Sequence, residues 1–140
     1  MQKATRVQRL IASIIDGLIM AIVISPIIFL TSSNVNGAPT YLYTLLLNIV
    51  AIIVFFLINW KFLVNDGQTI GKKIMKIKIV KVEGSKIDQD TIIKRYGLYF
   101  VLGLVPYIGG LLSLINILLI FREDIRCGHD LFANTIVITA

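Results

Sequence analysis

The chain has 140 residues, of which 56% are hydrophobic and 16% charged, and its mean hydropathy is +0.84. A soluble domain of this length has too little interior to bury so much apolar surface. The composition therefore excludes an ordinary soluble domain and predicts an integral membrane protein. The formal net charge is +6, and the basic residues are clustered. Such clustering is typical of membrane topology and contact with anionic lipid, and it does not favour nucleic-acid binding.

The first apolar segment covers residues 10–30 and follows Lys3, Arg6 and Arg9. Basic residues before an apolar run also begin a signal peptide. This run is longer than the ~7–15 apolar residues of a signal peptide, and no small-residue cleavage pattern follows it. Because about 20 apolar residues cross a bilayer, we expect a retained membrane span.

Asp16 is the one formal charge inside this segment. A carboxylate in hydrocarbon costs roughly 2.5–3.5 kcal/mol, so it needs a compensating role. Arg9 lies seven residues earlier, and Ser13 lies between them, so helical spacing predicts one polar stripe. Two interpretations stay open: a pair that orients the span at the membrane boundary, and a site that handles ions or protons.

The second apolar segment covers residues 41–60 and ends at Trp60 beside Lys61, a typical interfacial anchor. The connector 31–40 carries no charge, whereas the connection 61–95 is strongly basic. The positive-inside rule therefore predicts that the N-terminus and 61–95 are cytoplasmic and that 31–40 is outside. The basic residues of the connection are Lys61, Lys72, Lys73, Lys76, Lys78, Lys81, Lys86, Lys94 and Arg95.

Two short strands are expected on the cytoplasmic side. Residues 74–82 alternate apolar and basic side chains, which is the period of a strand with one packed and one solvated face. Residues 83–85 favour a turn, and residues 88–91 favour a helix start. Residues 135–138 are a second candidate strand. Because a lone strand is marginal, we expect the two to pair.

The third apolar segment covers residues 97–121 and contains a proline and two glycines within 106–110 (Pro106 to Gly110). A single kinked crossing would place the tail, 122–140, outside. The alternative is a broken or re-entrant helix that returns to the cytoplasm, which is tolerated where protein or water satisfies the freed backbone groups. We favour the return, because it places Asp130 on the same side as Arg9.

Together these segments predict an all-α membrane protein. We expect a helical bundle of three apolar segments with a small cytoplasmic β element, forming a single domain over residues 1–140.

Residues 127–130 bring three types of metal ligand together. Cys127 is the only cysteine, which excludes an intramolecular disulfide. With His129 and Asp130 it supplies three ligand types, but a structural zinc site needs four ligands with wider spacing. His129 is the only histidine, and the sequence shows no partner for a general base. We therefore expect no metal, no cofactor and no enzymatic activity.

Residues 67–72 follow the pattern Gly-x-Thr-x-Gly-Lys, with Gly67, Thr69, Gly71 and Lys72 as its fixed members. A P-loop has four residues between its glycines and Ser or Thr after the lysine. This pattern has three residues between the glycines, and Lys73 follows Lys72. A nucleotide site is therefore not expected.

Four features carry a resemblance that covers nearly the whole chain: Arg9 spaced from Asp16, the Gly-x-Thr-x-Gly-Lys pattern, Arg95, and the run 129–135 that begins with His129 and Asp130. In these features the chain resembles the RDD family of small bacterial membrane proteins. The resemblance assigns the arginine and the two aspartates of the family name to Arg9, Asp16 and Asp130. It implies a multi-pass protein of the bacterial cell membrane. Many members are uncharacterised, and some have been linked to cation/proton antiport.

Two functions are compatible with these features. The first is a transporter subunit in which Asp16 holds either a proton or a monovalent cation, so that the two are exchanged. Three apolar segments make too thin a wall for a sealed pathway, so this function requires a homo-oligomer. The second is a non-transporting assembly or accessory protein that binds another membrane protein or anionic lipid through its polar stripe and basic connection.

Overall fold

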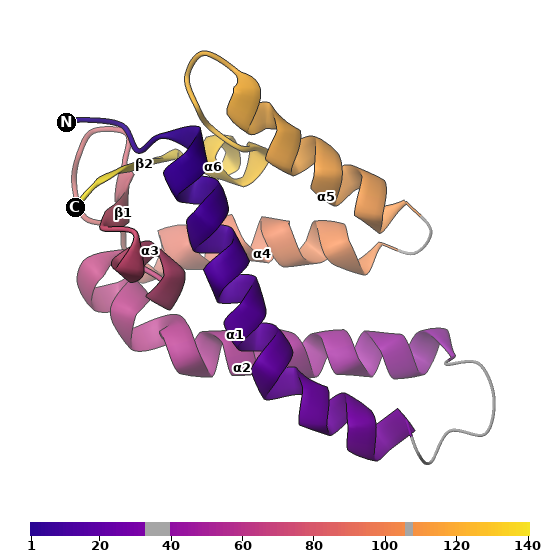
Figure 1. The fold of residues 1–140 in the computed structure, drawn as a ribbon. Helices are drawn as coiled ribbons and strands as arrows, with labels where there is room; N and C mark the ends of the chain where they lie inside the picture. Colours follow the sequence, from indigo (N-terminus) through magenta and orange to yellow (C-terminus); the bar gives the residue numbers. More distant parts are fainter. Residues whose placement is uncertain (33–39, 106–107) are drawn as a thin grey trace.

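A computed structural model of the protein describes residues 1–32, 40–105 and 108–140. Two long helices, α1 (Arg6–Ser32) and α2 (Tyr41–Asp66), extend away from a small end of the protein that contains both chain termini (Figure 1). We call this end the cap. It consists of the N-terminal residues, α3 (Ile70–Ile74), β1 (Ile77–Lys81), α6 (Gly128–Phe132) and β2 (Thr135–Thr139).

The helices α1 and α2 are long enough and apolar enough to cross a membrane. They have 27 and 26 residues, so each helix is about 40 Å long. This length exceeds the ~30 Å thickness of the hydrocarbon core of a bilayer. Only 6% of the most apolar stretch of each helix is buried inside the protein. Exposed side chains such as Ile22 and Leu57 therefore match a lipid environment, whereas water would disfavour them.

The third apolar segment is a helical hairpin. The chain runs through α4 (Gln89–Leu104) and returns beside it through α5 (Gly109–Leu118) and the 3-10 turn η1 (Leu119–Phe121) (Figure 1). Helix α5 is about 15 Å long, too short to cross the hydrocarbon core by itself. The structure thus has the broken form of segment 97–121. Of the predicted break, Pro106 lies outside the described residues.

Gly109 permits the close approach of the two hairpin helices. A Cβ atom at this position would lie 2.9 Å from the carbonyl oxygen of Leu102 and 3.1 Å from that of Gly103. Any larger residue would push α5 away from α4.

The predicted strand pair is confirmed. Strands β1 and β2 are antiparallel, with Ile79 opposite Val137. The first strand starts later than predicted, at Ile77 rather than residue 74, because residues 70–74 form α3 and Lys76 takes a positive φ of 54°. The alternation of apolar and basic residues starts at Ile74 in the sequence, but Ile74 is the last residue of α3.

The helices extend beyond the expected apolar segments, most clearly at the end of α2 and the start of α4. Helix α2 continues past Trp60 to Asp66 and ends at Gly67, whose φ of 67° is left-handed. A side chain there would also meet the carbonyl oxygen of Ile79 at 2.5 Å. Helix α4 begins within the expected connection 61–95, where Asp88 accepts a hydrogen bond from the backbone N–H of Thr91. Helix therefore covers both ends of this connection.

The core lies where α2 and α4 meet the cap. Leu63, Ile77, Ile79 and Ile92 are fully or almost fully buried there. Aromatic rings continue the core along the two helices, with the centroid of Phe55 5.2 Å from Tyr96 and 5.4 Å from Phe100. This core fixes α4 against α2 and so positions the polar residues described next.

Candidate functional site

Asp130 is fully buried in the cap and forms ion pairs with two arginines. Arg9 of α1 binds Oδ2, and Arg95 of α4 binds Oδ1. The carboxylate also accepts a hydrogen bond of 2.9 Å from the backbone N–H of Cys127. Arg95 also donates a hydrogen bond to Thr135 Oγ1 at 2.5 Å. One side chain thus joins α1, α4 and the C-terminal segment.

The surroundings of Asp130 keep it ionised. Burial alone raises the pKa of a carboxyl group, but Arg95 and Arg9 together outweigh burial, so the pKa of Asp130 lies well below its ordinary value. A buried carboxylate with two guanidinium partners is costly to disrupt, because each remaining charge would be left unpaired.

Asp16 forms a second, separate cluster with the Gly-x-Thr-x-Gly-Lys pattern. Thr69 Oγ1 donates to Oδ2 at 2.5 Å, and the backbone N–H of Gly71 donates to Oδ1 at 2.7 Å. The ammonium Nζ of Lys72 lies 3.9 Å from Oδ2. Hydrogen bonds from α3 thus hold a carboxylate that belongs to a membrane-spanning helix.

The predicted polar stripe of Arg9, Ser13 and Asp16 does not act as one unit in the described structure. Arg9 turns toward Asp130, and Asp16 turns toward α3. Ser13 Oγ donates to the backbone carbonyl of Arg9 at 3.0 Å and bridges neither charge. Helical spacing placed the residues on one side of α1 correctly, but each charge found a stronger partner on another element.

Gly71 is required by the contact between α1 and α3. A Cβ atom there would lie 2.2 Å from the carbonyl oxygen of Ala12 and 2.9 Å from the carboxylate of Asp16. Thr69 is the N-cap of α3 and accepts from the backbone N–H of Lys72. In the structure, Thr69 and the backbone N–H of Gly71 in this pattern therefore bind the carboxylate of Asp16, not a phosphate.

His129 is a neutral histidine in the cap. Its backbone N–H donates to Asn116 Oδ1 at 2.8 Å, and its Nδ1 lies 3.0 Å from Asn116 Nδ2. Burial, followed by the positive charge of Arg95, lowers the pKa of His129 to about 3. At neutral pH the imidazole therefore adds no charge to the site.

Ligand atoms of Cys127, His129 and Asp130 lie within 4.8 Å of one another. The oxygens of Asp130 already face two guanidinium groups, and burial raises the pKa of the Cys127 thiol. Since a metal needs a deprotonated thiolate and a free carboxylate, this group is poorly suited to hold one.

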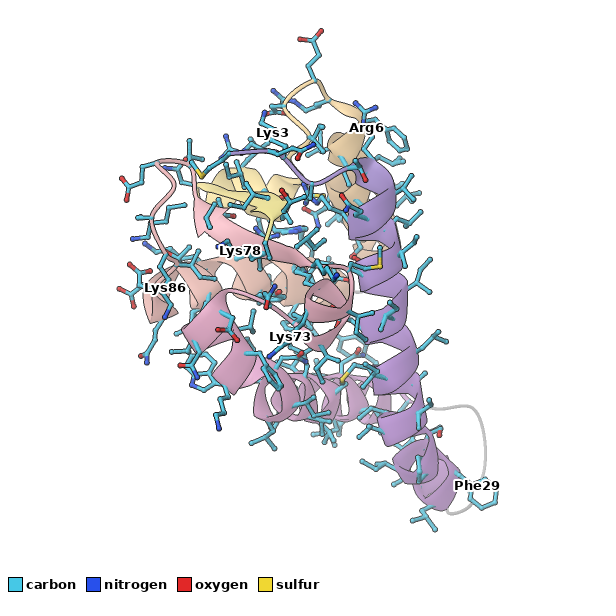
Figure 2. The ribbon with its side chains drawn as sticks, turned by 60° about the vertical axis from the view of Figure 1, so that its left-hand side comes forward. Lys3, Arg6, Phe29, Lys73, Lys78 and Lys86 are labelled. Carbon is cyan, nitrogen blue, oxygen red and sulfur yellow. The ribbon has the colours of Figure 1, made fainter. Side chains whose placement is uncertain are left out.

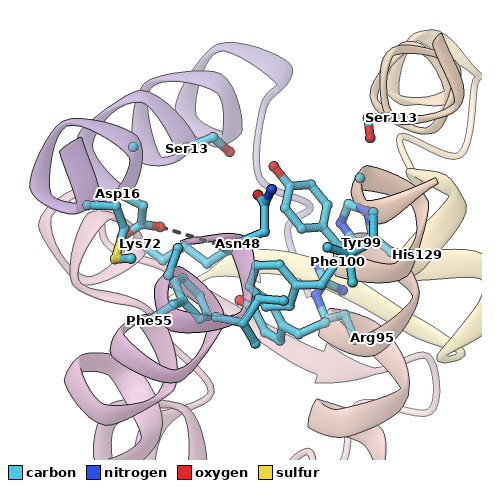
Figure 3. A pocket seen from close by; sticks show the side chains of 17 residues that line it. Ser13, Asp16, Asn48, Phe55, Lys72, Arg95, Tyr99, Phe100, Ser113 and His129 are labelled. Atoms are coloured by element: carbon cyan, nitrogen blue, oxygen red, sulfur yellow. Dashed lines mark ion pairs between the residues drawn. The ribbon is translucent and has the colours of Figure 1, made fainter. Parts of the chain in front are cut away.

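A pocket of about 420 Å³ lies between the helices, next to both clusters (Figure 3). Its charged or titratable lining residues are Asp16, Lys72, Arg95, Tyr96, Tyr99 and His129. Its apolar lining includes Met20, Ile52, Phe55, Phe100 and Leu104. The volume is within the range of roughly 300–1,000 Å³ that is usual for ligand sites.

The sequence matches the RDD family over residues 3–134. The chain belongs to the RDD family. It is also similar to the uncharacterized protein YckC of Bacillus subtilis (strain 168), with 45% identity over 73 residues. That match covers 51% of this chain and 46% of YckC, so it spans about half the length of the curated relative. No solved structure matches the chain.

Family membership and the two exposed apolar helices identify this RDD protein as an integral membrane protein. The arginine and two aspartates assigned from the resemblance occupy two places in the fold. Arg9 and Asp130 meet in the cap, whereas Asp16 binds α3. Arg95 completes the first cluster, and Thr69, Gly71 and Lys72 complete the second. Gly67 ends α2 and carries no contact to either carboxylate that we describe.

The pocket was not foreseen from the sequence. Apolar residues such as Phe55, Phe100 and Leu104 have the same character whether they face lipid, core or cavity. The one signal was polar side chains inside apolar segments, such as Asn48. That side chain lines the pocket and donates to the carbonyl oxygen of Thr44 at 2.9 Å in its own helix.

Proposed function

We propose that this RDD protein is a non-enzymatic, multi-pass protein of the bacterial cell membrane that binds an anionic ligand in its pocket. The N-terminus and the connection 61–95 face the cytoplasm in this proposal, as the charge asymmetry of the sequence indicates. The protein then acts as an accessory or assembly protein and not as an enzyme.

The observation that carries this proposal is an imbalance of charge beside the pocket. Among the residues described there, Arg9, Lys72 and Arg95 are cationic, Asp16 and Asp130 are anionic, and His129 is neutral. One positive charge is therefore left without a carboxylate. An unbalanced charge shielded from water is costly, and an anionic ligand would balance it.

The outer surface of the cap is basic, which also favours a negatively charged ligand. Figure 2 shows Lys3, Arg6, Lys78 and Lys86 around the cap, whereas Phe29 lies at the opposite end of α1. A basic surface at one end of a membrane protein attracts anionic lipid of the cytoplasmic leaflet. We expect these residues to contact lipid and to raise the local concentration of anions near the pocket.

A thermal-unfolding titration of the purified protein in neutral detergent tests this proposal. Inorganic phosphate should raise the midpoint of unfolding more than sodium chloride of equal ionic strength does, because ligand binding stabilises the folded state. Lys72→Gln should remove this difference. Lys73→Gln is the matched control, because the neighbouring side chain is 55% exposed and pairs with Asp66 on the surface. An equal response of both variants and the wild type would reject the pocket as an anion site.

Cation/proton exchange by a homo-oligomer is the second candidate. The observation that favours it is the position of Asp16, which lines the pocket and, among the residues that the structure describes, has the ammonium of Lys72 as its one ionic partner, at 3.9 Å. A cation entering the pocket would compete with that ammonium for the carboxylate. In sealed vesicles, Asp16→Asn should abolish cation-driven dissipation of a pH gradient. Unchanged exchange by well-folded Asp16→Asn protein would rule out this role.

A further inference from the structure

We propose that the ligand of the pocket is an anionic phospholipid of the cytoplasmic leaflet, with its phosphate beside Lys72 and one acyl chain along the apolar wall. This inference rests on the proposed anion-binding function and specifies the ligand. The structure supports it through three features: the order of polar and apolar lining residues, the way the pocket opens, and the location of positive charge.

The lining changes from polar to apolar along the membrane direction. Lys72 and His129 belong to the cap, and Arg95 lies in the half of α4 nearest to it. Leu104 is the last residue of α4, at the far end, and Phe100 lies one turn before it. Ser113 and Asn48 are polar exceptions further along the pocket. A ligand that fits this order has a charged head at the cap and an apolar tail pointing away from it.

The pocket is exposed on the side that α1 lines. Helix α1, with Ser13 and Asp16, forms one wall, and α5, with Ser113, lies on the other side (Figure 3). Helix α1 packs chiefly against α3, whereas α5 packs against α4 and α6. The lining residues Ser13 and Gly17 of α1 are exposed. An acyl chain in the bilayer can therefore reach the pocket along this exposed part of α1.

Charge selects the class of lipid. Arg9, Lys72 and Arg95 together carry one positive charge more than Asp16 and Asp130 balance, and this excess favours a headgroup with net negative charge over a zwitterionic one. The cytoplasmic leaflet is the anionic one, and it faces the end of the protein that carries the basic residues. The pocket's volume of about 420 Å³ is at the small end of ligand sites. It suits part of a lipid, with the remaining chain in the bilayer.

Gly17 offers a direct test of occupancy. It lines the pocket, and a Cβ atom there would meet nothing within 4 Å, so Gly17→Leu adds apolar bulk at the pocket wall without a clash at its Cβ. Gly97→Leu is the matched control, because a Cβ at Gly97 also meets nothing within 4 Å and Gly97 does not line the pocket. Both variants add the same apolar group to a membrane helix.

The experiment measures retention of phosphatidylglycerol by native mass spectrometry, with phosphatidylcholine and soluble glycerol phosphate as competitors. We expect wild type and Gly97→Leu to retain phosphatidylglycerol about tenfold better than phosphatidylcholine. Gly17→Leu should lose retention about tenfold, and Lys72→Met should lose the preference for the anionic lipid. Lys73→Gln, which changes an exposed lysine that pairs with Asp66, should keep both. If Lys72→Met does not fold, Gly17→Leu and Gly97→Leu still decide occupancy.

Four outcomes overturn the inference. Equal retention of the two lipids removes its charge basis, and retention unaffected by Gly17→Leu removes the pocket as the site. Glycerol phosphate that binds in a Lys72-dependent way while phosphatidylglycerol binds no better would reject the lipid but leave the anion-binding function standing. If neither probe binds, both the lipid and the anion-binding function are wrong.

Discussion

Arg9 and Asp130 are separated by 121 positions in the sequence and form an ion pair in the interior of the cap. This pair fastens the start of the first membrane helix to the C-terminal segment. It forms because the α4–α5 hairpin returns the chain, and Arg6 reinforces the return by donating to the carbonyl oxygens of Ile120 and Phe121. Both chain ends therefore belong to one side of the protein.

Asp130→Asn should be strongly destabilising. The amide cannot neutralise Arg9 and Arg95, and breaking a buried pair by removing one partner costs about 3–5 kcal/mol. We expect a lower yield of folded protein and a lower midpoint of thermal unfolding in detergent. Asp66→Asn is the control, because its pair with Lys73 is exposed and surface pairs contribute little. Similar unfolding midpoints for the two variants would contradict the central role of Asp130.

Gly71→Ala should separate α3 from α1. The added methyl would lie 2.2 Å from the carbonyl oxygen of Ala12, and such overpacking costs about 1–3 kcal/mol. Gly17→Ala in α1 is the control. A Cβ atom at Gly17 would meet nothing within 4 Å, so this substitution should be neutral or slightly stabilising. Thermal unfolding of both variants in one detergent gives the comparison. Equal stability would show that α1 and α3 are not in close contact.

Single cysteines should reveal the topology. Ser85 and Glu123 are exposed on either side of the α4–α5 hairpin, and Thr40 precedes α2 at the other end of the bundle. In intact cells an impermeant thiol reagent should label Thr40→Cys only, since the native Cys127 is buried. After permeabilisation all three should react. Labelling of position 123 but not 85 in intact cells would show that the hairpin crosses rather than returns.

The stability of the cap should depend on pH through His129. The unfolded chain takes up a proton near pH 6.5, whereas the folded chain does so only near pH 3, so the unfolded state binds more protons between these values. Stability therefore falls as the pH falls through this window, by roughly 2 kcal/mol between pH 8 and pH 5. His129→Gln should show a smaller loss over this range. Parallel pH profiles for the variant and wild type would contradict a neutral, buried imidazole.

The sequence by itself determined the parts of the fold that depend on local composition and period. The long apolar runs predicted α1 and α2, and alternation in 74–82 predicted β1. Asp88 marked a helix start, and the break within 106–110 predicted the hairpin. These features are readable because apolar length, side-chain period and capping chemistry act within a few residues of one another.

Only the tertiary structure decided which charges meet. Arg9 and Asp16 share a side of α1, yet Arg9 binds Asp130 and Asp16 binds the backbone of α3. Which carboxylate a long arginine side chain reaches depends on where the hairpin returns and how closely Gly71 lets α3 approach. The pocket has the same origin, because it is space left between helices whose separation is set by contacts remote in sequence. The spacing of residues along α1 determines which side of the helix a charged side chain lies on. The packing of several elements determines which partner that side chain contacts.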